Sequence, residues 1–142
     1  IHRQVSVVPA SEKISGILGI TPGELLVRVE VIEAIEGKPS MYLDDYLLPG
    51  VVSEDEIRAY QGSVLDFVMR EAQARVTHAL SEIFSIDAPE NIAEKLKIPP
   101  EKSLLHLLET YYTADGKKPG VSLVYILTDN FHFFITRRAA NW

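Results

Sequence analysis

The sequence predicts an α+β domain, an antiparallel sheet of five or six strands with helices on one side. Three observations lead to this prediction. Apolar and polar residues alternate over several stretches, which is typical of half-buried strands. Turns rich in Gly and Pro separate these stretches in pairs, as they do in β-hairpins. A unit of helix end, turn and hairpin also occurs twice. With 142 residues, we expect a single domain spanning residues 1–142.

The first part of the chain predicts a strand, a helix and a hairpin. Val5–Val8 is a short apolar run typical of an entry strand. Ser11 is placed to cap a brief helix, and Gly19 is placed to end it. Apolar residues then recur at every second position from Leu25 to Val31, and the return strand covers about Met41–Leu48.

The middle of the chain predicts short helices followed by a strand. Ser53 begins a capping-box pattern, Gly62 interrupts the helix, and Ser63 offers a second start. The next strand is expected to carry its apolar residues on one face: Val76, Leu80, Phe84 and Ile86.

The last third predicts a helix, a long hairpin and a closing strand. Asp87–Pro89 is suited to start a short helix, because the missing backbone N–H of Pro89 does no harm in the first turn of a helix. The hairpin strands are expected at 104–113 and 121–127. A final strand at about 131–137 closes the domain.

An internal repeat supports this arrangement. Leu18–Gly23 and Leu96–Glu101 are both a helix end followed by a turn with Pro, and each precedes an apolar strand. The separation of equivalent residues drifts only from 78 to 80. Such a small drift indicates a duplicated helix–hairpin unit.

Composition excludes several functional classes. The chain has no cysteine, which rules out disulfides, thiolate zinc sites, iron–sulfur clusters and cysteine nucleophiles. Its net charge of −6 has the wrong sign for gripping nucleic-acid phosphates. Apolar stretches are too short for a membrane span, so we expect a cytoplasmic protein. No nucleotide-binding motif or metal-ligand spacing is present, and we expect no cofactor, no metal and no catalytic residue.

Polar residues on otherwise apolar strand faces are the candidate ligand-binding residues. Burying an unpaired charge is costly, so such groups pair with each other, reach solvent or line a cavity. The alternative for each of them is an ordinary strand surface. Four interrupt apolar faces, and three more on return strands could add hydrogen bonds: Glu33, His78, Glu82 and His106, then Tyr42, Asp44 and Tyr125.

The two repeat units, Leu18–Pro49 and Leu96–Arg138, and the helix between them resemble the UTRA domain. This is the effector-binding half of many bacterial GntR-type transcription repressors, and the resemblance runs from about Ser6 to Arg138. It implies a chorismate-lyase-like fold, a small-molecule effector, a homodimer and an N-terminal winged helix-turn-helix domain that contacts DNA. This chain does not contain that DNA-binding domain, and on the resemblance we expect it in the full-length protein.

The resemblance also bears on single residues. Ser63 matches a serine that contributes a hydroxyl group to the effector in related domains. Val31 and Glu33 stand where sugar-phosphate-responsive members carry arginines, while Val121 and Ile126 replace a glutamate and a tyrosine. Losing two arginines argues against a phosphate ligand. We therefore expect an apolar pocket that accepts a neutral or amine-bearing molecule.

Two alternatives to an effector sensor stay open. The fold's namesake is a lyase, and His78 could form an acid–base pair with Glu82 or Glu33 by tertiary contact. The departures from the family pattern also fit a dimerisation module that no longer binds a ligand.

Overall fold

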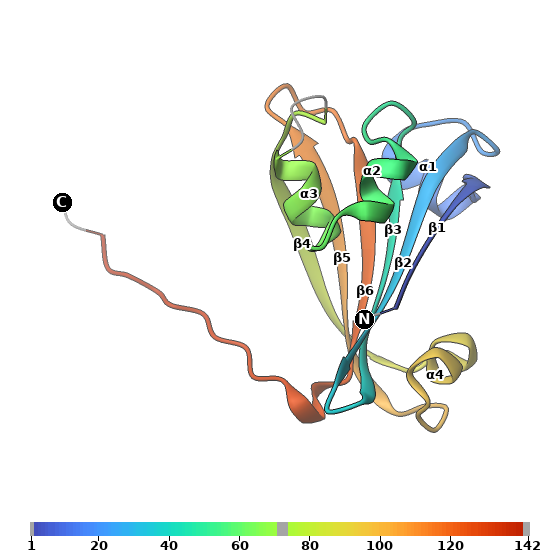
Figure 1. Ribbon diagram of the computed structural model, residues 1–142. Helices are drawn as coiled ribbons and strands as arrows, with labels where there is room; N and C mark the ends of the chain where they lie inside the picture. Colours follow the sequence, from blue (N-terminus) through green and yellow to red (C-terminus); the bar gives the residue numbers. More distant parts are fainter. Residues whose placement is uncertain (1, 71–73, 141–142) are drawn as a thin grey trace.

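A computed structural model describes residues 2–70 and 74–140 and contains one six-stranded antiparallel sheet (Figure 1). The strand order is β1-β2-β3-β6-β5-β4, which confirms the predicted sheet. The strands are β1 (His2–Pro9), β2 (Leu25–Ile35), β3 (Lys38–Leu47), β4 (Val76–Asp87), β5 (Ser103–Thr113) and β6 (Gly120–Ile126). The helices are α1 (Glu12–Leu18), α2 (Glu54–Ala59), α3 (Val64–Arg70) and α4 (Glu90–Leu96), with a 3₁₀ turn at Thr128–Asn130.

The predicted repeat is visible in the backbone hydrogen bonds. The N–H of Ala10 donates to the carbonyl of Glu24 at 2.7 Å, and 78 residues later the N–H of Ala88 donates to Lys102 at 2.8 Å. Helices α1 and α4 both end in a residue with positive φ, 70° and 54°. The units β1-α1-β2-β3 and β4-α4-β5-β6 meet where β3 pairs with β6.

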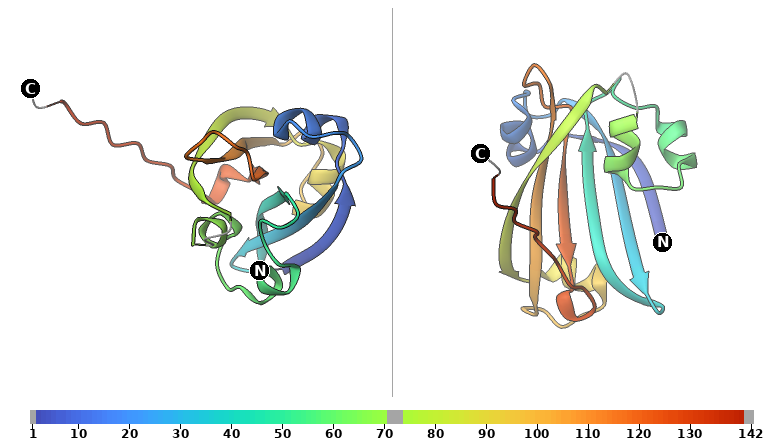
Figure 2. Two further views of the ribbon diagram at one scale, coloured as in Figure 1. Left: turned by 90° about the horizontal axis from the view of Figure 1, so that it is seen from above. Right: turned by 90° about the vertical axis from the view of Figure 1, so that its left-hand side faces the viewer.

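Both faces of the sheet are covered by helices, so the prediction of helices on one side was wrong. Face A carries Val27, Val29 and Val31 of β2, and α2 and α3 pack on it. Face B carries Leu26 and Arg28, with α1 and α4 near opposite ends of the strands (Figures 1 and 2). The repeat places α1 and α4 on the same face, whereas α2 and α3 belong to the connection between the repeats and cross to the other face.

The face A core fixes the position of α2 and α3. Ile57 of α2 and Val64 and Val68 of α3 are buried against the strands, and burying such side chains stabilises the fold by roughly 1.5–3 kcal/mol each. From β1, the Arg3 guanidinium donates hydrogen bonds to carbonyls in the α2–α3 segment, including that of Gly62. The start of α3 is therefore held against the sheet.

Two strand predictions need correction. A β-bulge between Val76 and His78 turns Val76 to face A, so Val76 does not share a face with Leu80. The predicted final strand at 131–137 is an extended segment that leaves the domain and pairs with no described strand (Figure 1). It follows β6, which already has a partner on each side and offers no free edge.

No helix within residues 2–70 and 74–140 is long and apolar enough to cross a membrane. Within the same ranges, no group of three or more His, Asp or Glu side chains is placed to hold a metal ion.

Candidate functional site

A cavity of about 210 Å³ lies between face A and the beginning of α3, and we call it the α3 cavity. It is lined by alternate residues of three adjacent strands, because side chains at every second position share a face. The strand residues are Met41, Leu43 and Asp45 of β3, Ser122, Val124 and Ile126 of β6, and Leu107, Glu109 and Tyr111 of β5; Ser63, Val64 and Leu65 close it from above.

Asp45 is the buried polar group of this cavity. Its side chain is 1% exposed, and its Oδ1 accepts a 2.5 Å hydrogen bond from the Tyr111 hydroxyl. Its Oδ2 is one of two buried side-chain polar atoms that lack a hydrogen-bond partner in the part of the chain that the structure describes; the other is Nε of Arg3. A buried acceptor without a donor lowers the stability of the fold by about 1–3 kcal/mol. The place where a protein retains such an acceptor is therefore a candidate binding site.

Burial controls the ionisation of this group. It raises the pKa of Asp45 to about 7, although the hydroxyl groups of Tyr111 and Ser122 beside the carboxyl act in the opposite direction. Burial next to this carboxyl also raises the pKa of Tyr111 well above its ordinary value. Near neutral pH, the carboxyl group of Asp45 is therefore only partly ionised. A positively charged ligand would favour its ionised form, which accepts hydrogen bonds.

The remaining lining is mostly apolar and carries no basic group. Glu109 is half-buried, and burial raises its pKa as well. None of the described lining residues is Lys, Arg or His. A cavity with acidic groups, hydroxyls and aliphatic walls suits a neutral or cationic small molecule and disfavours an anion.

Ser63 lies at the rim and has a structural role as well. Its Oγ accepts a 3.0 Å hydrogen bond from the N–H of Asp66, so it caps α3 as predicted. The hydroxyl proton is not used by that bond and remains available to a ligand. The Tyr60 hydroxyl donates to Asp66, which further fixes this turn.

Of the eight predicted ligand-binding residues, the structure brings Ser63 into the α3 cavity and places Glu33 on the same face. Glu33 pairs in register with Met41, which lines the cavity. The other six lie on face B, because their registers alternate with those of the lining residues: Tyr42, Asp44, His78, Glu82, His106 and Tyr125.

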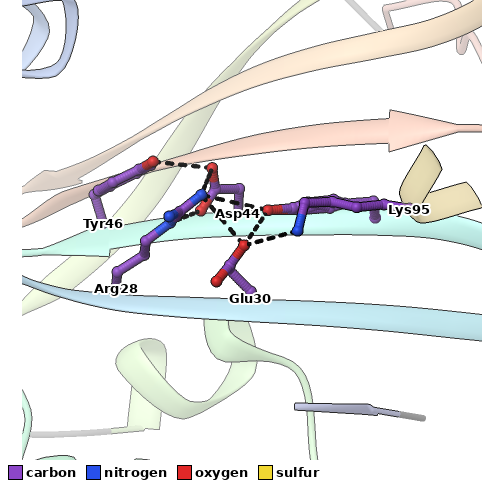
Figure 3. Close-up of polar contacts among 6 residues, drawn as sticks. Arg28, Glu30, Asp44, Tyr46 and Lys95 are labelled. Atoms are coloured by element: carbon purple, nitrogen blue, oxygen red, sulfur yellow. Dashed lines mark hydrogen bonds and ion pairs between the residues drawn. The ribbon is translucent and has the colours of Figure 1, made fainter. Parts of the chain in front are cut away.

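Asp44 and Tyr42 belong to a charge network on face B (Figure 3). Arg28 donates to both carboxylate oxygens of Asp44, at 2.7 and 3.0 Å, and the Tyr42 hydroxyl donates to Glu30 at 2.6 Å. Lys95 of α4 pairs with Glu30 at 3.4 Å. Although burial opposes it, the hydrogen bond from Tyr42 and the charges of Arg28 and Lys95 hold the pKa of Glu30 below its ordinary value. Two cations face two carboxylates, so the network is internally satisfied.

An aromatic row crosses face B beside this network. The rings of Tyr42 and Tyr125 lie 6.0 Å apart, and His106 stacks on Tyr125 at 4.4 Å. His106 is also tied by its Nδ1 to the carbonyl of Val124 at 2.9 Å. These contacts join three strands, β3, β6 and β5, and give the row a packing role.

His78 and Glu82 are exposed on β4. The His78 ring stacks on Tyr112 at 5.3 Å, and its Nδ1 contacts the hydroxyl of Thr77. Glu33 lies on the opposite face of the sheet from His78, so those two do not form an acid–base pair.

Asp45 is a candidate site residue that the sequence did not predict. The predicted residue is its neighbour Asp44, which lies on face B, whereas Asp45 shares face A with Leu43 and Leu47. The signal was therefore present as a carboxylate on the apolar face of a strand. Larger depressions, of about 280, 430 and 490 Å³, lie beside loops, two of them at the turn around Asp115 and one at residues 49–55.

A family model and several solved structures match this chain. The model of the UTRA domain matches residues 2–132. No curated protein matches the chain. A protein from Streptomyces coelicolor described as a transcriptional regulator is 26% identical, with a TM-score of 0.81 and coverage of 96% of this chain and 94% of the other.

Two further solved structures share the fold. The first is described as the ligand-binding domain of a GntR-family transcriptional regulator from Bordetella bronchiseptica. It is 20% identical, with a TM-score of 0.77 and coverage of 99% of this chain and 90% of the other. The C-terminal domain of Yurk from Bacillus subtilis is also 20% identical, with a TM-score of 0.78 and coverage of 94% and 92%.

Proposed function

The chain belongs to the UTRA domain family, the effector-binding domains of GntR-type regulators, and from this premise we propose that the α3 cavity is its effector site. The observation that carries the proposal is the unpartnered Oδ2 of Asp45 in a cavity of about 210 Å³. Apolar cavities of about 150 Å³ hold a benzene molecule, so this one has room for a ring with a short side chain.

The proposed role is regulatory rather than catalytic. An effector that prefers one arrangement of the domain shifts the population towards it, and an effector with equal affinity for both arrangements regulates nothing. We propose that this shift reaches operator DNA through a winged helix-turn-helix domain in the full-length cytoplasmic repressor. The net charge of −6 supports leaving DNA contact to that other domain.

We also propose that the domain acts as a homodimer, in which the extended segment 131–137 of one copy lies along β4 of the other. This strand is an edge of the sheet, and Leu80, Ile83 and Phe84 on it are exposed. The extended segment 131–137 exposes Phe134 at 87% and Ile135 at 82%. Edge strands with exposed apolar residues recruit further strands. Glu82 and Asp87 of β4 also complement Arg137 of the segment in charge.

The effector site is tested by blocking the cavity. A thermal-shift panel of amino acids, amines, sugars and aromatic acids supplies ligands, and calorimetry measures their affinity. Leu107→Trp fills the cavity from β5, and Leu25→Trp adds the same ring at the exposed start of β2 as a matched control outside the cavity. We expect the first variant to abolish binding and the second to retain it. Binding that survives in Leu107→Trp places the ligand elsewhere, and consumption of the ligand indicates an enzyme.

A further inference from the structure

Asp45 carries information about the chemical class of the ligand. The nine strand residues around the cavity come from β3, β6 and β5, and three are ionisable: Asp45, Glu109 and Tyr111. Each of these side chains is neutral when protonated and negative when deprotonated, so none carries a positive charge. Arg3 is on the same face but donates its guanidinium N–H groups to carbonyls of the α2–α3 segment, and it is not among the lining residues.

The hydrogen-bond pattern specifies what is missing. The Tyr111 hydroxyl spends its single proton on Oδ1 of Asp45 at 2.5 Å, so it does not serve Oδ2. Oδ2 makes no hydrogen bond among the described residues, and the hydroxyl of Ser122, which pairs in register with Asp45, is the protein donor beside this carboxyl. A ligand that completes this carboxylate must bring an N–H or O–H donor. A charged donor forms a hydrogen bond roughly twice as strong as a neutral one.

Resting on the effector site proposed above, we propose that the α3 cavity binds a small organic cation, an ammonium group on a compact apolar body, with Oδ2 of Asp45 as its acceptor. The aliphatic side chains of Leu43, Leu107 and Val124 contact the apolar body. Glu109 adds negative potential near the same strands, and the hydroxyl of Ser63 serves the open end. This goes beyond the family assignment, which names no ligand.

The same geometry predicts how binding depends on pH. A cation binds the ionised form of Asp45, whose pKa is raised by burial to about 7. Affinity for an amine therefore rises roughly tenfold from pH 6 to pH 8, while the amine itself stays protonated. The groups that face or flank Asp45 are Tyr111 and Glu109 of β5 and Asp44 of β3. The lining residues of β6 and α3 are uncharged.

Three probes of similar shape test the proposal. Calorimetry with 2-phenylethylamine, 2-phenylethanol and 3-phenylpropanoate compares a cation, a neutral alcohol and an anion. We expect the amine to bind at least tenfold more tightly than either of the others at pH 8. We expect Asp45→Asn to remove this preference and the pH dependence. Leu107→Trp should abolish amine binding, and Leu25→Trp, outside the cavity, should leave it unchanged.

The outcomes separate this inference from the proposed effector site. If the protein prefers the alcohol or the acid, and Leu107→Trp abolishes that binding, the proposal of a cationic ligand is overturned but the cavity is still the effector site. Absence of amine binding at millimolar concentration also overturns the cation. Amine binding that survives in Leu107→Trp overturns both proposals, because the ligand then lies outside the α3 cavity. Within the wild-type protein, equal affinity at pH 6 and pH 8 contradicts recognition by Asp45 even if the variants fold poorly.

Discussion

The hydroxyl of Tyr111 on β5 donates a 2.5 Å hydrogen bond to Asp45 on β3, although the two strands are not neighbours. Strand β6 lies between them, and Gly120 is the β6 residue that pairs with Tyr111. Because Gly120 has no side chain, the Tyr111 ring lies across β6 and reaches the carboxyl group. The polar floor of the cavity therefore depends on a glycine.

Replacing Gly120 by alanine should disturb this floor. The added Cβ would lie 2.7 Å from the backbone carbonyl oxygen of Tyr46 and 3.1 Å from Cδ2 of Tyr111. The backbone contact cannot be relieved by a side-chain rotation, so we expect a loss of about 1–3 kcal/mol in the free energy of unfolding. Urea denaturation measures it.

Gly16→Ala is the matched control for this substitution. Gly16 lies in α1, and nothing lies within 4 Å of an added Cβ. Alanine is favoured over glycine in a helix by about 0.5–1 kcal/mol, so the same chemical change should stabilise the protein there. Equal effects of the two substitutions would contradict a specific role for Gly120.

Asp45 should make the folded protein less stable as the pH rises. Its folded pKa of about 7 lies above the ordinary value of 3.8, so the folded state binds more protons than the unfolded state between these values. For this group, stability is therefore highest below about pH 4, falls as the pH rises from about 4 to about 7, by up to about 4 kcal/mol in total, and levels off above pH 7.

Urea denaturation of the wild type and of Asp45→Asn from pH 5 to pH 8 isolates this contribution. Asparagine keeps an oxygen for the Tyr111 hydroxyl but does not titrate, so the downward slope should flatten in the variant. Glu109 is present in both proteins, and its raised pKa contributes equally to both curves. Parallel curves would show that Asp45 is not the titrating group.

Much of the fold was predictable because its signals are local. Ser11 caps α1 through the N–H of Ile14, and Gly19 ends the helix with a φ of 70°, both as expected from single residues. The repeat was predictable because turns of the same length recur. The helices on both faces were not predictable, since β2 is buried on face A and half-buried on face B, and alternation alone does not show which helix covers which face.

The site was harder to predict because it depends on register between distant strands. Asp44 and Asp45 are adjacent, and one residue of offset sends the first into a charge network and the second into the α3 cavity. Tyr111 reaches Asp45 across 66 residues of sequence, and no local pattern announces that contact. The β-bulge next to Val76 likewise turns this side chain to face A, and no pattern in the sequence indicates the bulge.

Ser63 and Glu33 remain predictions as effector contacts. Calorimetry should show weaker binding of a panel ligand by Ser63→Ala and by Glu33→Ala. Alanine also removes the cap of α3 and costs about 1 kcal/mol of stability, so Ser63→Asn is needed, which restores capping without the hydroxyl. Weak binding in both Ser63 variants supports a hydroxyl contact. Full affinity in Ser63→Asn would reduce the role of Ser63 to capping.

Arg28 should stabilise face B more than an exposed ion pair stabilises a helix. Arg28→Ala leaves Asp44, which is buried, without its cation, and we expect a loss of about 1–3 kcal/mol given the partial exposure of Arg28. Arg70→Ala breaks an exposed i,i+4 pair with Asp66 and should cost at most about 0.5 kcal/mol. Urea denaturation of both variants decides whether the network contributes more than a surface pair.

The dimer proposal predicts that the two edges of the sheet differ. Ile83→Lys on β4 and Phe134→Lys in the extended segment should each weaken self-association at least tenfold, because a lysine replaces an apolar side chain that is 62% or 87% exposed in the single chain. Val7→Lys makes a similar change on β1, the opposite edge, and should leave the dimer intact. Light scattering after size-exclusion chromatography at several concentrations measures the association. Loss of the dimer in Val7→Lys but not in the other two would move the interface to β1, and a monomeric wild-type chain at all concentrations would remove the proposal.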